Sequence, residues 1–243
     1  MALHFLADSA SDAGPGDDVV LDGAEAHHAA AVRRIRVDEQ VTVGDGRGAW
    51  LTGHCVAVSP REVVVRVDER TEIDPPVRRL VLVQALAKGD RDELAVQAAT
   101  ELGVDAIVPW QAERSVSRWD AKAAKGVARW SAIVREAAKQ AHRAWVPEVA
   151  DLARTADLVR LASGTRMLVL EPGAPEPLSG AALGGDGQDV VLIVGPEGGI
   201  SPAESAALTA AGAQSVRLGD TVLRTSTAGA AALAVASVRL DRW

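Results

Sequence analysis

Cysteine is nearly absent from this chain of 243 residues, which contains only Cys55. A single thiol cannot form an internal disulfide, so packing and hydrogen bonds must hold the fold, as is usual in a reducing compartment. No basic segment opens the sequence ahead of an apolar run, and the longest uncharged stretch near the end is too short to span a bilayer. From these absences we expect no secretory signal, no membrane span and a cytoplasmic location.

Several common catalytic motifs are also missing. The sequence contains no glycine-rich loop ending in Lys-Ser or Lys-Thr, no G-x-G-x-x-G opening a strand–helix unit and no G-x-S-x-G. These absences argue against a P-loop nucleotide site, a Rossmann dinucleotide site and a serine nucleophile elbow. The single cysteine and the five scattered histidines show no zinc-ligand spacing, so we expect no metal.

Negative charge predominates, with a formal net charge of −7, which by itself disfavours a nucleic-acid partner. The distribution of charge alters that expectation. Residues 1–76 carry 7 arginines against 14 acidic residues, whereas residues 114–143 carry eight basic and two acidic residues. A smaller basic cluster, 33–36 (RRIR), lies in the acidic first part. A basic helix is either a solvated face or a nucleic-acid contact, and charge alone leaves both readings open.

Aromatic residues are few, with no tyrosine, one phenylalanine and six tryptophans. Three of the tryptophans, Trp119, Trp130 and Trp145, flank the basic segment. They either stack on nucleic-acid bases or anchor the helix to the core.

Asp74-Pro75-Pro76 marks a linker, because consecutive prolines prevent helix formation and remove sheet donors. Short alternating runs before it predict a small β-barrel or curled sheet. Its strands are expected near 41–43, 50–58 and 62–67, with one helix over 24–32. Strands and helices alternate after the linker, which predicts the α/β class with a mostly parallel sheet. The strands expected there are 80–85, 106–109, 167–170, 190–194 and 215–218, and the helices 91–102, 120–141, 202–211 and 227–238. We therefore expect two domains, 1–74 and 77–243.

Two glycine-containing loops near the C-terminus carry the strongest functional signal. The first, 195–200 (GPEGGI), follows an uncharged β-branched strand and precedes a helix start with Ser201 as N-cap and Glu204 at the capping-box position. The second, 218–229 (LGDTVLRTSTAG), lies between a short strand and a helix of small residues. Such loops present main-chain groups at the C-terminal edge of a sheet, where ligands bind. The glycines could serve only tight turns, but a carboxylate such as Glu197 between proline and glycine is a good site residue.

The order and spacing of several motifs resemble the bacterial 16S ribosomal RNA uracil-N3 methyltransferases of the SPOUT (trefoil-knot) superfamily. The motifs are 87–91 (AKGDR), 100–104 (TELGV), 113–116 (ERSV), 129–130 (RW), 136–140 (EAAKQ) and the two glycine loops, with His28, 32–36 and 45–46 in the N-terminal part. The resemblance covers nearly the whole chain. It implies a knotted α/β domain after a PUA-like RNA-binding β-barrel, S-adenosylmethionine as cofactor, a homodimer, and 16S ribosomal RNA within the small ribosomal subunit as substrate.

The resemblance also assigns residues to the site. The implied cofactor pocket is formed by Leu170, Glu171, Gly195, Pro196, Glu197, Gly198, Gly199, Ile200, Leu218, Leu223, Arg224, Thr225, Thr227 and Ala228. The implied RNA-binding residues are Arg33, Arg34, Arg36, Arg114, Arg118, Gln140 and Arg143.

Methylation at uracil N3 requires removal of a proton and a positive group near the charge that spreads onto O2 and O4. We expect Glu197 to accept or relay that proton and Arg224 to stabilise the uracil anion. The family's second loop reads Leu-Arg-Thr-Glu-Thr-Ala, whereas this chain has Ser226 at the glutamate position. The expected base is therefore confined to the first loop.

Two alternatives remain on the sequence alone. One is a SPOUT methyltransferase acting on another RNA, either transfer RNA or another ribosomal site. The other is a non-catalytic RNA-binding or ribosome-assembly factor with the same fold. The N-terminal barrel and 113–116 favour the uracil-N3 family, and the intact first loop with Arg224 favours an enzyme. The helix 227–238 suits either a dimer interface or the core.

Overall fold

The computed structural model describes residues 2–185 and 187–243, which form two compact units. The first unit comprises Met1–Pro75 and Ala138–Val146, and the second comprises Pro76–Ala137 and Pro147–Trp243. The units follow the chain less simply than the expected division at 1–74 and 77–243, because Ala138–Val146 packs with the N-terminal residues. The exact domain boundaries stay a prediction.

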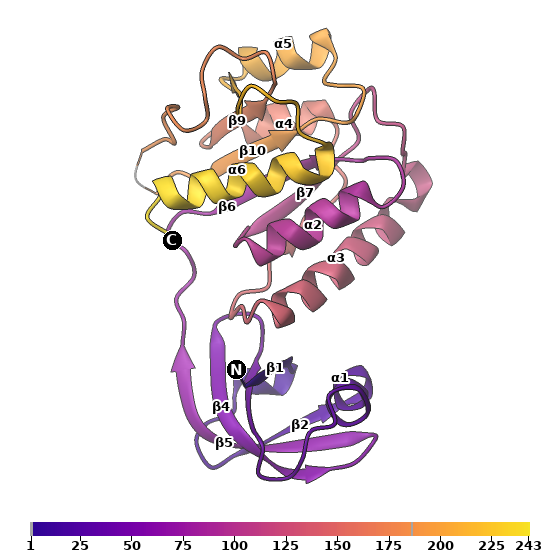
Figure 1. The fold of residues 1–243 in the computed structure, drawn as a ribbon, viewed down its shortest axis with the longest axis vertical. Helices are drawn as coiled ribbons and strands as arrows, with labels where there is room; N and C mark the ends of the chain where they lie inside the picture. Colours follow the sequence, from indigo (N-terminus) through magenta and orange to yellow (C-terminus); the bar gives the residue numbers. More distant parts are fainter. Residues whose placement is uncertain (1, 186) are drawn as a thin grey trace. The chain divides into compact units, whose positions relative to one another are not determined.

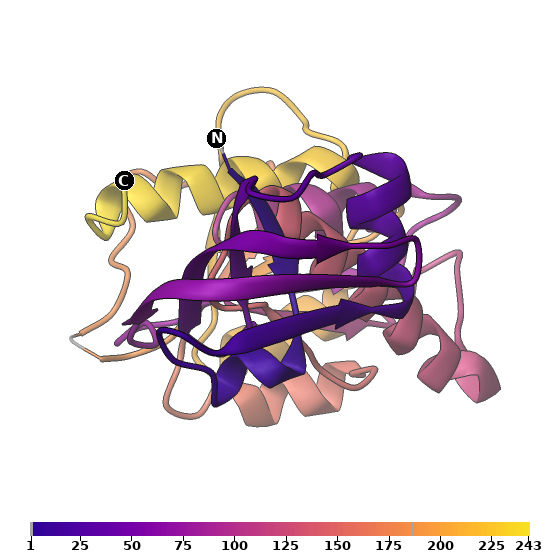
Figure 2. The same cartoon turned by 90° about the horizontal axis from the view of Figure 1, so that it is seen from below.

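The first unit is built on a five-stranded sheet in the order β1-β3-β4-β5-β2, seen from below in Figure 2. Its strands are β1 (Leu3–Leu6), β2 (Asp18–Asp22), β3 (Gln40–Gly44), β4 (Ala49–Val58) and β5 (Glu62–Glu72). Only β1 and β3 pair in parallel, and the other neighbours are antiparallel. Val63, Val65 and Val67 alternate inward along β5 and pack with Phe5 and Leu21 in one core.

The helical segments of this unit are short. They are η1 (Asp8–Ser11), α1 (Gly23–His27) and the π-helical η2 (His28–Val32), so the helix predicted over 24–32 is present as two consecutive segments. The strands β1 and β2 were not predicted. Each lies at an edge of the sheet and has only four or five residues, too few for a clear alternation.

The second unit contains a six-stranded sheet in the order β11-β9-β10-β6-β7-β8, with every neighbouring pair parallel. The strands are β6 (Leu80–Ala85), β7 (Ala106–Trp110), β8 (Glu148–Val149), β9 (Arg166–Leu170), β10 (Val190–Val194) and β11 (Gln214–Val216). The helical segments are α2 (Arg91–Glu101), η3 (Asp120–Lys122), α3 (Ala123–Gln140), α4 (Thr155–Leu161), α5 (Pro202–Ala210) and α6 (Thr225–Arg239). The predicted strands and helices of this part are confirmed within a few residues. The sequence did not indicate β8 and α4, which are short.

Helix α6 lies across the sheet next to α2, as Figure 1 shows, and packs on α2, β10 and β6. Ala228, Ala232 and Ala236 are buried on its inner face. Small side chains let the helix approach the sheet closely, which is why one face of this helix is core.

Of the three tryptophans near α3, Trp130 is buried, and Trp119 and Trp145 are half-buried. Trp130 is buried and meets Trp119 edge-on, with ring centroids 5.1 Å apart. The indole N–H of Trp145 donates a hydrogen bond to the carbonyl of Ile73. The structure therefore supports the anchoring role for Trp130. Among the described residues, none of the helices combines the length and apolar character needed to cross a bilayer.

Helix α5 begins with the predicted capping box. The Ser201 hydroxyl accepts the N–H of Glu204 at 3.3 Å, and the Glu204 carboxylate accepts the N–H of Ser201 at 3.1 Å. The same carboxylate accepts the N–H of Glu113 at 2.9 Å and the hydroxyl of Thr155 at 2.7 Å. Burial raises the pKa of Glu204, but these hydrogen bonds outweigh burial and hold the pKa below its ordinary value.

We predict that Glu204→Gln lowers the free energy of unfolding at pH 7 by about 1–3 kcal/mol, since a hydrogen-bonded carboxylate loses its charge. A carboxylate with a lowered pKa in the folded state stabilises the protein above its unfolded pKa and loses that effect as pH falls. The difference in unfolding free energy between wild type and variant should therefore shrink as the pH falls below 4.5, the ordinary pKa of a glutamate. Denaturant titrations from pH 7 to pH 3 test this, with exposed Glu69→Gln as control. A difference that stays constant with pH contradicts it.

Candidate functional site

The two glycine-containing loops meet at the C-terminal edge of the parallel sheet. The hydroxyl of Thr225, at the start of α6, donates to the carbonyl of Gly195 at 3.1 Å. It also accepts the side-chain N–H of Gln84, the buried polar residue of β6, at 2.9 Å. One threonine thus joins the loop after β10, the start of α6 and the neighbouring strand β6. The sequence predicted the two loops, and the structure shows that they adjoin.

The loop surfaces combine exposed main chain with apolar side chains. Gly198, Gly199 and Gly219 are exposed, while Ile200, Leu218 and Leu223 are half-buried. Glycine is required at two positions of the first loop. Gly199 has a φ of +72°, and a Cβ on Gly195 would lie 2.7 Å from Cγ1 of Ile200. This surface offers what a nucleoside needs, namely apolar walls and main-chain partners.

The remaining residues predicted for the cofactor pocket are placed differently from one another. Leu170 ends β9 and Glu171 follows it, and the Glu171 carboxylate accepts a hydrogen bond from the hydroxyl of Ser205 on α5. Pro196 and Ala228 are buried, whereas Arg224 and Thr227 are exposed at the start of α6. The chain after β11 is hydrogen-bonded to the loop after β9. The backbone N–H of Arg217 donates to the carbonyl of Glu176, and the N–H of Leu178 donates to the carbonyl of Arg217.

Glu197 is held in an ion pair. Its Oε1 atom lies 3.1 Å from both the backbone nitrogen of Lys88 and the guanidinium of Arg91. Partial burial raises the pKa of Glu197, but hydrogen bonds from its own amide, from Lys88 and from Arg91 outweigh burial and lower the pKa. Because its pKa is lowered, the carboxylate is ionised at neutral pH. Its side chain is 26% exposed and therefore accessible. This contact connects the first loop to the 87–91 segment.

Arg114, predicted to bind RNA, lies against the first loop. Its guanidinium donates to the carbonyl of Gly198 at 3.2 Å, and a Cβ on Gly198 would lie 3.2 Å from the Cβ of Arg114. Arg118 donates to the carbonyl of Glu113 in the same segment.

A groove of about 280 Å³ lies beside this region in the second unit. Its lining residues are Gly89, Asp92, Glu93, Ser117, Arg118, Trp119, Lys122, Lys125, Gly126, Arg129 and Trp130. Basic side chains dominate its rim, and Arg129 forms an ion pair with Glu93 at 2.7 Å. Asp92 is buried, and burial raises the pKa of its carboxyl. The sequence indicated the basic helix but not that Asp92 and Glu93 line the same groove.

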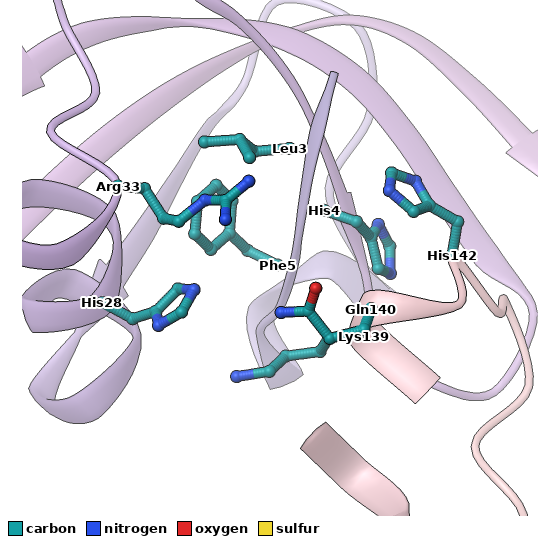
Figure 3. A pocket seen from close by; sticks show the side chains of 8 residues that line it. All are labelled: Leu3, His4, Phe5, His28, Arg33, Lys139, Gln140 and His142. Atoms are coloured by element: carbon teal, nitrogen blue, oxygen red, sulfur yellow. The ribbon is translucent and has the colours of Figure 1, made fainter. Parts of the chain in front are cut away.

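The first unit holds the other predicted RNA-binding residues. Arg33 and Gln140 line a common pocket of about 30 Å³, shown in Figure 3, whereas Arg34, Arg36 and Arg143 do not line it. The pocket also contains residues that the sequence analysis did not select, His4, Lys139 and His142. No spacing signal connects them, because they come from opposite ends of this discontinuous unit. Among the described residues, no group of three or more histidine, cysteine or acidic side chains could hold a metal ion.

Comparison with known proteins identifies the family of this chain. An RNA methyltransferase domain model matches residues 74–237, and an RNA methyltransferase PUA domain model matches residues 21–68. The ribosomal RNA small subunit methyltransferase E of Mycobacterium bovis is 46% identical, over 100% of this chain and 94% of the relative. The protein of the same name in Bacillus subtilis is 31% identical, over 90% of this chain and 89% of the relative.

Solved structures agree with these matches. A putative methyltransferase from Legionella pneumophila with bound S-adenosylmethionine superposes with a TM-score of 0.88 at 29% identity, covering 98% of both chains. The ribosomal RNA small subunit methyltransferase E of Neisseria gonorrhoeae, bound to S-adenosylmethionine, has a TM-score of 0.87 at 29% identity and covers 98% of both chains. The predicted fold class, an α/β domain with a parallel sheet and a PUA-like N-terminal part, is confirmed. With loops, sheet and full-length relatives in agreement, the chain belongs to the RNA methyltransferase family that carries an N-terminal PUA domain.

Proposed function

We propose that this protein transfers a methyl group from S-adenosylmethionine to N3 of a specific uridine in the 16S RNA of the small ribosomal subunit. The observation that carries the proposal is the junction of the two glycine loops through Thr225 at the C-terminal edge of the sheet. Relatives named for the small ribosomal subunit and two similar structures with bound S-adenosylmethionine support it.

The residues at the junction fit the cofactor. Exposed main chain at Gly198 and Gly219, with half-buried Ile200, Leu218 and Leu223, suits an adenosine that needs apolar contact and backbone hydrogen bonds. The bound cofactor supplies an electrophilic methyl group on a sulfonium. Leu170, Glu171, Pro196, Thr227 and Ala228 complete the proposed pocket around these loops.

Deprotonation of uracil N3 is the chemical problem that the protein side chains must solve. We assign the removal of this proton to Glu197, whose carboxylate is ionised and partly exposed. Its lowered pKa makes this carboxylate a weak base, so in the proposal it relays the proton to water rather than keeping it. The N3 electron pair then forms the new N–C bond as the methyl C–S bond breaks. Exposed Arg224 holds the negative charge that spreads over the uracil oxygens.

RNA binds, in this proposal, along the basic rim of the groove beside α3. Its volume of about 280 Å³ accommodates a base, and Trp119 offers an aromatic edge next to Arg118 and Arg129. Arg114 fixes the first loop while remaining exposed to the RNA.

A homodimer is part of the same proposal. Helix α6 uses its inner face for the core, yet Val238 is 59% exposed and the preceding Val222 is 78% exposed. Exposed apolar residues beside a helix of small side chains suit close packing against a second copy.

The direct test is methylation of small-subunit RNA. Purified protein with S-adenosylmethionine should restore one methyl group to RNA from a strain that lacks the gene, located at a uracil by mass spectrometry. A methyl group in another RNA would indicate a different target within the family. Failure to bind S-adenosylmethionine in calorimetry would indicate a non-catalytic RNA-binding factor.

Glu197→Gln should leave the affinity for S-adenosylmethionine nearly unchanged and reduce single-turnover methyl transfer about 10²–10⁴-fold, the usual contribution of a general base. Arg91→Gln is the matched control, because it breaks the same ion pair and keeps the carboxylate. Unchanged transfer in Glu197→Gln removes this residue from the proton step. An equal loss in both variants assigns the ion pair to loop positioning instead.

Arg224→Ala should reduce methyl transfer by about 10²-fold or more, because a group that stabilises developing charge acts mainly in the transition state. The affinity for S-adenosylmethionine should fall less. Arg224→Lys, which keeps the charge but not the planar fork, should recover part of the rate. Equal losses in transfer and in cofactor affinity would make Arg224 a cofactor-binding residue.

A further inference from the structure

A small pocket in the first unit gathers nitrogen-bearing side chains from separate segments of the chain. His4 comes from β1, His28 and Arg33 from η2 and the residue after it, and Lys139, Gln140 and His142 from the end of α3 and beyond. In Figure 3, Arg33 and His28 lie on one side, His4 and His142 on the other, with Lys139 and Gln140 between them. The cavity measures about 30 Å³.

The size of the cavity limits its occupant. A single water needs about 10–15 Å³ on this measure, so about 30 Å³ holds two oxygen atoms rather than a base. Arg33 and Gln140 are exposed at the rim, so a larger molecule could remain outside while one small group enters.

Lys139 supplies buried positive charge at this pocket. It is only 5% exposed, and its ammonium lies 2.8 Å from Oε1 of Glu25. Glu25 does not line the pocket and balances the charge of Lys139. Because Glu25 balances Lys139, the exposed guanidinium of Arg33 is the charge through which the lining attracts anions.

His4 provides a polar atom that lacks a protein partner. The residue is 7% exposed, and its ring stacks on Trp50 with centroids 4.3 Å apart. Nδ1 lies 2.9 Å from the hydroxyl of Thr42, while Nε2 is buried without a hydrogen bond. Burial, and then His142 and Lys139, lower the pKa of His4 to about 4, so the ring is neutral at pH 7.

The hydroxyl of Thr42 has one proton and two acceptors within reach, Nδ1 of His4 and the carbonyl of Leu3. The Thr42 hydroxyl is closer to Nδ1, at 2.9 Å, than to the carbonyl of Leu3, at 3.4 Å. When the hydroxyl donates to Nδ1, the imidazole proton lies on Nε2, and the proposal below requires this tautomer. Nε2–H is then a buried donor that a ligand oxygen would satisfy.

We propose that this pocket binds one phosphate group of the RNA backbone, with Arg33 supplying charge and Lys139, His4 and Gln140 donating hydrogen bonds. The inference rests on the proposed function, because it makes RNA the source of the phosphate. A phosphodiester fits better than a base, since the cavity admits only its two free oxygens and its lining is rich in donors.

Binding of a small-subunit RNA fragment should be measured at several salt concentrations for wild type, Arg33→Gln, His4→Phe and the control Arg61→Gln. Arg33→Gln should lower the slope of log affinity against log salt by about 0.7–0.9, the value of one phosphate contact. His4→Phe should weaken binding roughly five-fold without changing the slope, because it removes a neutral donor. Arg61→Gln, in an exposed turn of the same unit, should change neither quantity. Circular dichroism of each variant checks folding.

Side-chain NMR of the wild-type histidines separates the possible sources of phosphate. Inorganic phosphate and RNA should both shift the Nε2 resonance of His4. A shift with phosphate alone, together with wild-type RNA affinity in His4→Phe and Arg33→Gln, overturns the proposal in favour of a free anion. No shift with either probe also overturns it.

Methyl transfer and S-adenosylmethionine binding, measured in parallel on the wild type, distinguish this inference from the proposed function. Absent methylation with the expected losses of RNA binding counts against the function alone. Normal methylation with unchanged RNA binding in the two variants counts against the phosphate pocket alone.

Discussion

The hydroxyl of Thr225 is the contact on which the site depends. It donates to Gly195 and accepts from Gln84, so that a single side chain joins the loop after β10, the start of α6 and β6. Main-chain recognition requires the two loops to keep a fixed spacing, because backbone groups cannot adjust as side chains do. Backbone hydrogen bonds between Arg217 and the loop after β9 also hold the start of the second glycine loop.

Electrostatics around this junction are arranged by ion pairs rather than by net charge. Hydrogen bonds from Lys88 and Arg91 lower the pKa of Glu197. Asp92, next to Arg91 on α2, is buried and has a raised pKa. The two carboxyl groups differ in pKa because hydrogen bonds outweigh burial at Glu197, whereas burial dominates at Asp92. A chain with a net charge of −7 can still offer RNA a basic rim, since screening lets local clusters dominate.

Local patterns predicted much of this fold. The β-branched run of β10 and the Ser201–Glu204 capping box depend on neighbours within a few residues, and both are present as predicted. The basic helix was likewise recognisable from its composition. By contrast, α4 and the edge strands β1 and β2 are short, and their stability comes from packing partners distant in sequence. The role of Glu204 as acceptor for Glu113 and Thr155 was invisible for the same reason.

The sequence by itself determined the class of fold, the two glycine loops and the family resemblance, because these are carried by residue order. Only the tertiary structure decided that Ala138–Val146 belongs with the first unit and that His4, Arg33 and Lys139 share one pocket. It also decided that Glu197 is ion-paired with Arg91. The physical reason is that burial and charge pairing depend on distances through space, and residues more than a hundred positions apart share no local pattern.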